Sequence, residues 1–281
     1  MPVLHPNSIE DVGRALRDNP DATLLSGGTD LMVEVNLHGR RPTTIVSLNR
    51  VAELRTWSVD LSARRVVIGS AVPYADLEIG TIAEMVPALA QAARTVGSPQ
   101  IRAAGTLGGN LGTCSPAGDT LPVMSALGAI VNVASSDGGR SIRFADFMTG
   151  VKRNSLRAGE FVVSVELPIV TGWQGFAKVG TRNAMVISTA SACLVLDRGN
   201  GRVSTALGAV GPTIIDCRAS CDWLSDVTDL RHASPDSPTI AEFARRCADE
   251  ARPITDHRST ADYRRHAVGV VVRRLLERAT S

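Results

Sequence analysis

Two glycine-rich segments hold residue types that favour phosphate binding. The first, Ser26-Gly27-Gly28-Thr29-Asp30, follows the apolar stretch Thr23-Leu24-Leu25 and precedes a predicted helix that begins near Thr29 or Asp30. Glycines let the backbone approach a diphosphate closely and permit the positive-φ turns that direct successive N–H groups inward. A helix that begins at the same place adds unpaired N–H groups and the positive end of its dipole. Alone, the segment is equally consistent with a tight turn capped by Thr29 or Asp30.

The second segment, Thr106-Leu107-Gly108-Gly109-Asn110, repeats the small hydroxyl and the glycine pair. Together the two segments could hold one elongated anionic ligand from two sides. Asp119 lies further along, just before a helix predicted over Pro122–Leu127. It has two compatible roles, as the N-cap of that helix or as an acceptor for ribose or ribityl hydroxyls. Neither segment has the GxGxxG or GxxxxGK[ST] spacing, which disfavours a Rossmann domain and a P-loop.

The remaining reactive side chains form no recognisable catalytic or metal-binding pattern. No serine–histidine–acid array or paired carboxylate site is apparent, which indicates that substrate chemistry does not take place on this chain. The histidines show no ligand spacing, and the cysteines include no CxxC pair, so we expect no metal here. Lysine occurs only at 152 and 178, and this rarity makes each of the two a candidate for a specific role. The cysteines are Cys114, Cys193, Cys217, Cys221 and Cys247.

Predicted helices and strands precede or follow each glycine segment in the first half of the chain. Helix and strand alternate, which places this half in an α/β class. Six glycines and two prolines between Gly97 and Gly118 predict a long functional loop without regular structure. The predicted helices are 8–16 with Ser8 as N-cap, 75–78 and 88–96, and the predicted strands are 23–25, 44–48, 65–68, 129–134 and 161–167.

A change of composition near Thr171-Gly172 predicts a domain boundary. Strands are expected over 176–179, 191–196 and 204–210, with Asn200-Gly201 as a hairpin turn, and two helices end the chain. The last helix has an apolar stripe and several arginines, which we expect to face water or a partner. The stripe is Val268, Val271, Val272, Leu275 and Leu276, and the arginines are Arg264, Arg265, Arg273, Arg274 and Arg278.

Bulk composition is that of an ordinary globular protein, with 44% hydrophobic and 21% charged residues over 281 positions. The formal net charge of +2 is too close to neutrality for a nucleic-acid binder or a polybasic membrane binder. No signal sequence or stretch long enough to span a bilayer is apparent. We therefore expect a cytoplasmic protein that neither binds nucleic acid nor inserts into a membrane.

The segment from Gly97 to Asn110, GSPQIRAAGTLGGN, taken with Ser26 to Leu31, closely resembles the FAD-binding medium subunits of molybdenum hydroxylases. That family includes xanthine dehydrogenase, carbon monoxide dehydrogenase, and nicotine, quinoline and 4-hydroxybenzoyl-CoA enzymes. The resemblance continues through SVELP at 164–168, FAK at 176–178 and STADYRR at 259–265, so it covers nearly the whole chain.

The resemblance implies an α+β fold in two domains. Residues 1–172 would form a two-part FAD-binding domain of the vanillyl-alcohol-oxidase (PCMH-type) fold, with subdomains of about 1–57 and 58–172. Residues 173–281 would form a small α+β domain like that of carbon monoxide dehydrogenase flavoproteins.

Matching motifs also imply individual FAD contacts. Val96 would lie beside the flavin, Asp119 would bind sugar hydroxyls, Val163 would offer a backbone contact, and Lys178 would approach the flavin from the second domain. A cation near the pyrimidine end favours the anionic reduced flavin. The diphosphate would be held on one side by Leu24, Leu25, Ser26, Gly27, Gly28, Thr29, Asp30 and Leu31, and on the other by Thr106, Gly108, Gly109 and Asn110.

By the same resemblance, the chain would be an electron-transfer subunit without catalytic residues of its own. A large molybdopterin-binding subunit would act on the substrate, and a small subunit with two two-iron two-sulfur clusters would exchange electrons with FAD, in a dimer of heterotrimers. The external acceptor could be NAD, oxygen, a quinone or another carrier. A standalone FAD-dependent oxidoreductase and a non-catalytic nucleotide-binding or assembly protein of the same fold remain as alternatives.

One departure from the family concerns the stretch after Arg182. Relatives commonly carry an acid there, whereas residues 183–187 carry none, which puts in doubt an ion pair or acceptor contact at this place. Some relatives also carry an inserted iron–sulfur cluster, for which the cysteines of this chain have no suitable spacing.

Overall fold

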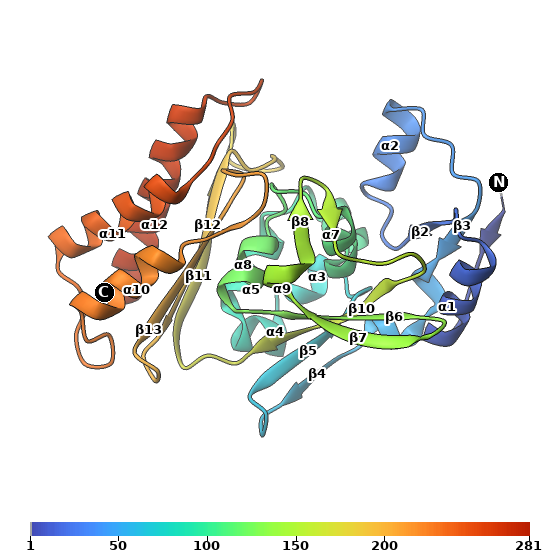
Figure 1. Cartoon of the computed structure of the whole chain (residues 1–281), viewed down its shortest axis with the longest axis horizontal. Coiled ribbons are helices and arrows are strands. Elements are labelled where there is room, and N and C mark those ends of the chain that lie inside the picture. Colours follow the sequence, from blue (N-terminus) through green and yellow to red (C-terminus); the bar gives the residue numbers. More distant parts are fainter. Residues whose placement is uncertain (1) are drawn as a thin grey trace.

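The N-terminal layer lies at one end of the molecule and contains a small parallel sheet. The computed structural model describes residues 2–281 and runs from this layer through a central body to a C-terminal layer (Figure 1). The sheet has the strand order β1-β3-β2. As predicted, Ser8 caps the first helix, because its hydroxyl accepts from the Asp11 N–H (3.1 Å). The elements are β1 (Val3–Leu4), α1 (Ile9–Asp18), β2 (Thr23–Leu25), α2 (Leu31–Leu37) and β3 (Ile45–Ser47).

The central body is built on a five-stranded antiparallel sheet of order β4-β5-β10-β6-β7. The expected α/β class is therefore wrong for this part, because hydrophobic periodicity predicts a strand but not the direction in which it pairs. The strands are β4 (Trp57–Asp60), β5 (Arg65–Gly69), β6 (Ile130–Ser135), β7 (Gly138–Arg143) and β10 (Phe161–Pro168), and β8 (Met148–Gly150) pairs with β9 (Arg153–Asn154). The helices are η1 (Leu48–Arg50), η2 (Ala52–Arg55), α3 (Tyr74–Leu77), α4 (Gly80–Met85), α5 (Pro87–Arg94), α6 (Pro99–Ala104), α7 (Leu107–Thr113), α8 (Leu121–Ala126) and α9 (Phe144–Phe147).

The expected long loop between Gly97 and Gly118 is also wrong, since α6 and α7 occupy most of it. Each helix begins at a side-chain cap: the Ser98 hydroxyl accepts from the Ile101 N–H (3.3 Å), and the Thr106 hydroxyl accepts from the Gly109 N–H (3.0 Å). Such caps stabilise short helices that glycine would otherwise disfavour.

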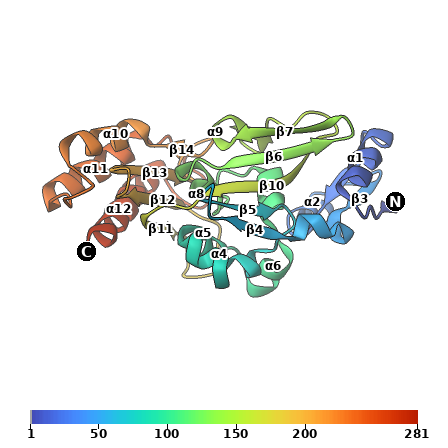
Figure 2. The ribbon, with the colours of Figure 1, turned by 90° about the horizontal axis from the view of Figure 1, so that it is seen from below.

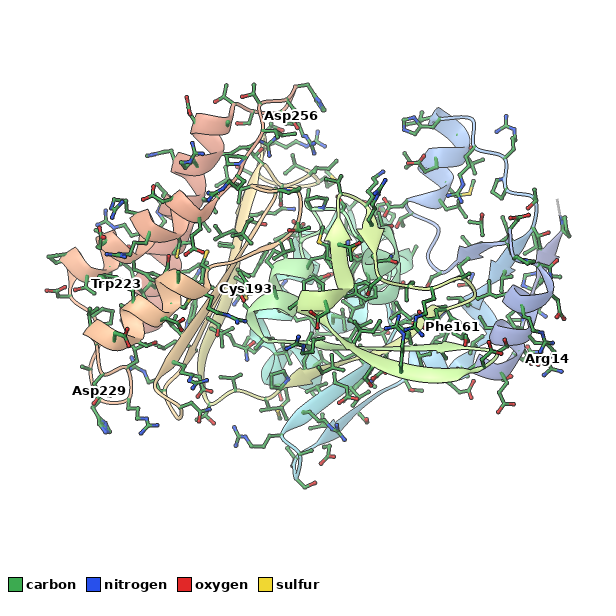
Figure 3. All side chains as sticks on the ribbon, viewed as in Figure 1. Arg14, Phe161, Cys193, Trp223, Asp229 and Asp256 are labelled. Carbon is green, nitrogen blue, oxygen red and sulfur yellow. The ribbon has the colours of Figure 1, made fainter. Side chains whose placement is uncertain are left out.

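The C-terminal layer is a four-stranded antiparallel sheet with three helices on its outer face (Figures 1 and 2). Along β12, Leu194 and Leu196 pack with these helices, whereas Cys193 and Val195 pack with the central body, so both faces are buried (Figure 3). The strands are β11 (Gly172–Val179), β12 (Ala190–Asp197), β13 (Arg202–Gly208) and β14 (Ile215–Asp216), and the helices are α10 (Arg218–Val227), α11 (Ser237–Glu250) and α12 (Ala261–Thr280).

The buried stripe predicted for α12 is confirmed, but the prediction that Arg264 faces water is wrong. Arg264 is 3% exposed, and its guanidinium donates to the carbonyls of Thr189 (2.7 Å) and Ala209 (2.9 Å) and to Asp256 (2.7 Å; labelled in Figure 3). It lies four residues before Val268 and therefore on the same face of the helix. None of the helices within residues 2–281 is long and apolar enough to cross a membrane.

Candidate functional site

A cavity of about 560 Å³ is lined by residues of the N-terminal layer and of the central body. Its volume lies within the range of small-molecule sites. Phe161 at the start of β10 belongs to its lining (labelled in Figure 3). Of the residues predicted to contact FAD, the cavity brings together Leu24, Leu25, Ser26, Gly27, Gly28, Thr29, Asp30, Leu31, Thr106, Gly108, Gly109 and Asn110.

The first glycine segment supplies open hydrogen-bond donors. β2 ends at Leu25, and Gly28 has a φ of +74°, which glycine adopts without strain. Within residues 2–281, the N–H groups of Gly27, Gly28, Thr29 and Asp30 donate to no acceptor. Backbone N–H groups without partners in a glycine-rich turn favour an anion.

The two glycine segments touch each other directly. A Cβ placed on Gly27 would lie 1.9 Å from the Ala104 carbonyl oxygen, so only glycine fits at this crossing. The hydroxyls of Ser26 and Thr106 lie 3.0 Å apart. Two segments about eighty residues apart in sequence therefore form one continuous wall of the cavity.

The second segment contributes surface and side chains but few backbone donors. The Gly108 N–H donates to the Ser70 carbonyl (2.8 Å), and the Thr106 hydroxyl and carbonyl take up the next two N–H groups. A Cβ on Gly108 would lie 2.4 Å from that of Ser70, so α7 approaches β5 as closely as glycine permits. The Thr120 hydroxyl donates to Asn110 Oδ1 (2.6 Å), which leaves the Asn110 Nδ2 group as a donor.

Asp119 and Lys178 do not line this cavity but form a buried ion pair between the central body and β11. Lys178 Nζ lies 2.6 Å from Asp119 Oδ2 and also donates to the carbonyls of Thr95 (2.8 Å) and Val186 (3.0 Å). An ammonium has three N–H donors, so all of them are engaged. The N-cap of α8 is Thr120, so Asp119 does not have the capping role.

The Asp119 carboxylate is held by several donors besides Lys178. Ser188 donates to Oδ1 (2.6 Å) and Thr95 donates to Oδ2 (3.1 Å). Burial raises the pKa of Asp119, and Lys178 and the two hydroxyls oppose that rise. A carboxylate has about four acceptor positions, so one remains for a further donor.

The other two predicted contacts, Val96 and Val163, are not among the residues that line the cavity. The Val163 carbonyl accepts from the Ser70 N–H (2.8 Å), and the Val96 carbonyl accepts from Arg102 (3.4 Å). At the acid-free stretch, the Arg182 guanidinium donates to the carbonyls of Ala184 and Met185. Backbone oxygens are therefore the acceptors of Arg182 in this stretch.

Several lining residues were not predicted from the sequence. Tyr74 and Ser70 follow β5, and Arg40 donates to the Thr23 hydroxyl (3.1 Å). Lys152, which its rarity had singled out, lies 3.5 Å from Glu34 on α2. Their positions depend on chain segments that meet only in the folded protein, so no local motif marks them.

Comparisons with known proteins cover nearly the entire chain. The family profile described as FAD binding domain in molybdopterin dehydrogenase matches residues 1–170, and that of the CO dehydrogenase flavoprotein C-terminal domain matches residues 176–279. The glyceraldehyde dehydrogenase medium chain of Sulfolobus acidocaldarius is 29% identical over 94% of this chain and 92% of its own length. The xanthine dehydrogenase FAD-binding subunit of Escherichia coli O157:H7 is 29% identical over 98% of this chain and 94% of its own length.

Solved structures share the fold at full length. The quinoline 2-oxidoreductase of Pseudomonas putida 86 superposes with a TM-score of 0.90 at 28% identity, covering 99% of this chain and 96% of the other. The carbon monoxide dehydrogenase of Hydrogenophaga pseudoflava gives a TM-score of 0.89 at 26% identity over the same shares. The fold is thus the expected two-part FAD-binding fold followed by a small α+β domain. The chain belongs to the FAD-binding medium subunits of molybdenum hydroxylases, the xanthine dehydrogenase and carbon monoxide dehydrogenase family, and is an oxidoreductase subunit with FAD as its cofactor.

Proposed function

We propose that this chain relays electrons through FAD within a cytoplasmic molybdenum hydroxylase of several subunits. A large molybdopterin-binding subunit would act on the substrate, and a small iron–sulfur subunit would exchange electrons with this chain, in a dimer of heterotrimers. The external acceptor receives or supplies the electrons at FAD. The five cysteines are buried and unpaired, as in proteins of a reducing compartment.

The observation that supports the relay role is how the charged side chains of the cavity are paired. Asp30 accepts from the Thr113 hydroxyl (2.8 Å), Glu34 faces Lys152, and Arg40 donates to Thr23. Each of these groups is exposed or already paired, and no two are arranged as a general acid and base for a substrate. The cavity is therefore suited to hold a cofactor rather than to transform a substrate.

The lining residues fit FAD. We infer that the open N–H groups of Gly27, Gly28, Thr29 and Asp30 hold the diphosphate, and that Asn110 Nδ2 adds a donor from the other side. When bound, FAD supplies reversible uptake of two electrons. The chain's part is to bind and orient the cofactor and to tune its charge.

We further propose that Asp119, Lys178, Val96 and Val163 surround the sugar and flavin portions, at the junction of the domains 1–172 and 173–281. Asp119 has one acceptor position left for a sugar hydroxyl. For Lys178 to contact the flavin, it must release one of its present acceptors, of which the Val186 carbonyl (3.0 Å) has the longest bond.

The relay role is tested on the complete complex after removal of FAD. Substrate should still reduce the molybdenum and iron–sulfur centres, which absorption and electron paramagnetic resonance spectra detect, while turnover with the external acceptor stops. Adding FAD should restore turnover. Acceptor turnover that continues without FAD contradicts the proposal, as does steady substrate turnover by the isolated chain.

A further inference from the structure

Tyr74 is a cavity residue that neither glycine segment includes. It begins α3 directly after Pro73, which pairs with Thr106, and its N–H donates to the Gly105 carbonyl (3.0 Å). The ring lies against Gly105, where a Cβ would stand 3.0 Å from the Tyr74 Cε2 atom. The backbone and the ring are therefore held beside the start of α7.

The hydroxyl of this tyrosine has no partner in the protein. Tyr74 is only 5% exposed and lines the cavity, and no side-chain hydrogen bond within residues 2–281 involves its Oη atom, which is not among the fully enclosed atoms that lack a partner. A buried hydroxyl without a partner is costly, and buried tyrosines usually find one. The Ser70 hydroxyl also lacks a partner, but it is fully enclosed. Because Tyr74 lines the cavity, its partner can come from a ligand bound there.

The electrostatic surroundings keep the hydroxyl a donor. Burial raises the pKa of Tyr74 far above its usual range, and the carboxylates of Asp119 and Asp30 raise it further. The phenol therefore remains protonated and neutral. The same cavity is also lined by the open N–H groups of the first glycine segment, which favour oxygen acceptors.

We propose that the Tyr74 hydroxyl binds the cofactor, donating a hydrogen bond to an oxygen of the ribityl–phosphate chain of FAD. This inference rests on FAD occupying the cavity, as in the proposed function. Tyr74 thereby adds a side-chain contact to the backbone donors of the glycine segments.

The test compares Tyr74→Phe with Tyr263→Phe. Tyr263, the only other tyrosine, is 49% exposed on α12 and serves as the matched control. Apoprotein is titrated with FAD, and flavin fluorescence reports the Kd. Because Tyr74→Phe removes a hydrogen bond to a charged acceptor, its affinity for FAD should be about 10-fold lower or more. Tyr263→Phe should leave the affinity unchanged.

Thermal unfolding of the apoprotein separates a ligand-binding role from a structural one. Since the hydroxyl has no partner in the protein, Tyr74→Phe should leave the Tm of the apoprotein unchanged or raise it. Unchanged FAD affinity, or a lowered Tm of the apoprotein, would overturn the inference. If the wild-type chain itself bound no FAD, the proposed function would fail first, so the two failures are distinguishable. Titration with riboflavin, which has no phosphate, then identifies the acceptor. If the acceptor is a ribityl oxygen, Tyr74→Phe weakens binding of both riboflavin and FAD. If it is a phosphate oxygen, Tyr74→Phe weakens binding of FAD alone.

Discussion

The contact between the two glycine segments gives the sharpest prediction, because Gly27→Ala adds one carbon where there is no room. The new Cβ would lie 1.9 Å from the Ala104 carbonyl oxygen and 2.9 Å from Gly105 Cα. Ordinary contacts begin at 3.4 Å, so the segments must separate by about 1.5 Å. That movement is enough to break the contact between the hydroxyls of Ser26 and Thr106, now 3.0 Å.

The expected cost has two parts. Overpacking of this kind lowers the free energy of unfolding by about 1–3 kcal/mol. Displacing the open N–H groups weakens one or two hydrogen bonds to the diphosphate, each worth about 1.5–3 kcal/mol. We therefore expect FAD affinity to fall by about 10- to 100-fold or more, because each 1.4 kcal/mol corresponds to about a factor of ten.

The assay titrates apoprotein with FAD and follows flavin fluorescence, while urea unfolding gives stability. The matched control is Gly150→Ala on β8, outside the cavity, whose Cβ would meet nothing closer than the Arg153 side chain at 3.7 Å. It should leave FAD affinity unchanged. If Gly27→Ala binds FAD as tightly as the wild type, the reasoning that this crossing shapes the diphosphate site is refuted.

Two further predictions concern stability. Gly108→Ala should lower the free energy of unfolding of the apoprotein by about 1–3 kcal/mol, because its Cβ would lie 2.4 Å from that of Ser70. On the same helix, the Cβ of Gly112→Ala would meet nothing within 4 Å, so this substitution should raise the free energy of unfolding by about 0.5–1 kcal/mol. If urea unfolding gave the same change in free energy for both variants, the prediction would be contradicted. The Arg140 guanidinium lowers the pKa of Glu160 from 4.5 to about 2. Because the folded pKa is the lower one, this stabilisation is present above about pH 4.5 and is lost as the pH falls towards 2. Glu160→Gln should therefore make the free energy of unfolding depend less on pH over this window. If the free energies of the variant and of the wild type changed in parallel with pH, the lowered pKa of Glu160 would be contradicted.

Local sequence signals were sufficient for several of the elements and for the identity of the cofactor. The Ser8 cap, the strand before Gly27 and the buried stripe of α12 all depend on neighbours a few residues away, and the structure confirms them. The glycine pairs also identified the family, because a backbone that must approach a diphosphate closely restricts the residues at these positions.

Tertiary structure decided how the two segments differ. The second segment is a helix whose backbone donors are already engaged, locally by the hydroxyl and carbonyl of Thr106 and, only after folding, by the carbonyl of Ser70. The first segment keeps its donors open. In the sequence, both contain a small hydroxyl residue and a glycine pair, and both had the same expected role.

Long-range contacts likewise decided the environment of the polar side chains. Arg264 is buried because the carbonyls of Thr189, just before β12, and of Ala209, just after β13, accept from it. Lys178 is fully engaged because Asp119 and Thr95 approach it from the central body. Tyr74 lines the cavity because α3 and α7 meet there, although they are distant in the chain. The sequence identified which residues could bind the cofactor. Only the folded structure determined which of their donors remain open for it, because the pairing of a polar group depends on atoms far away in the chain.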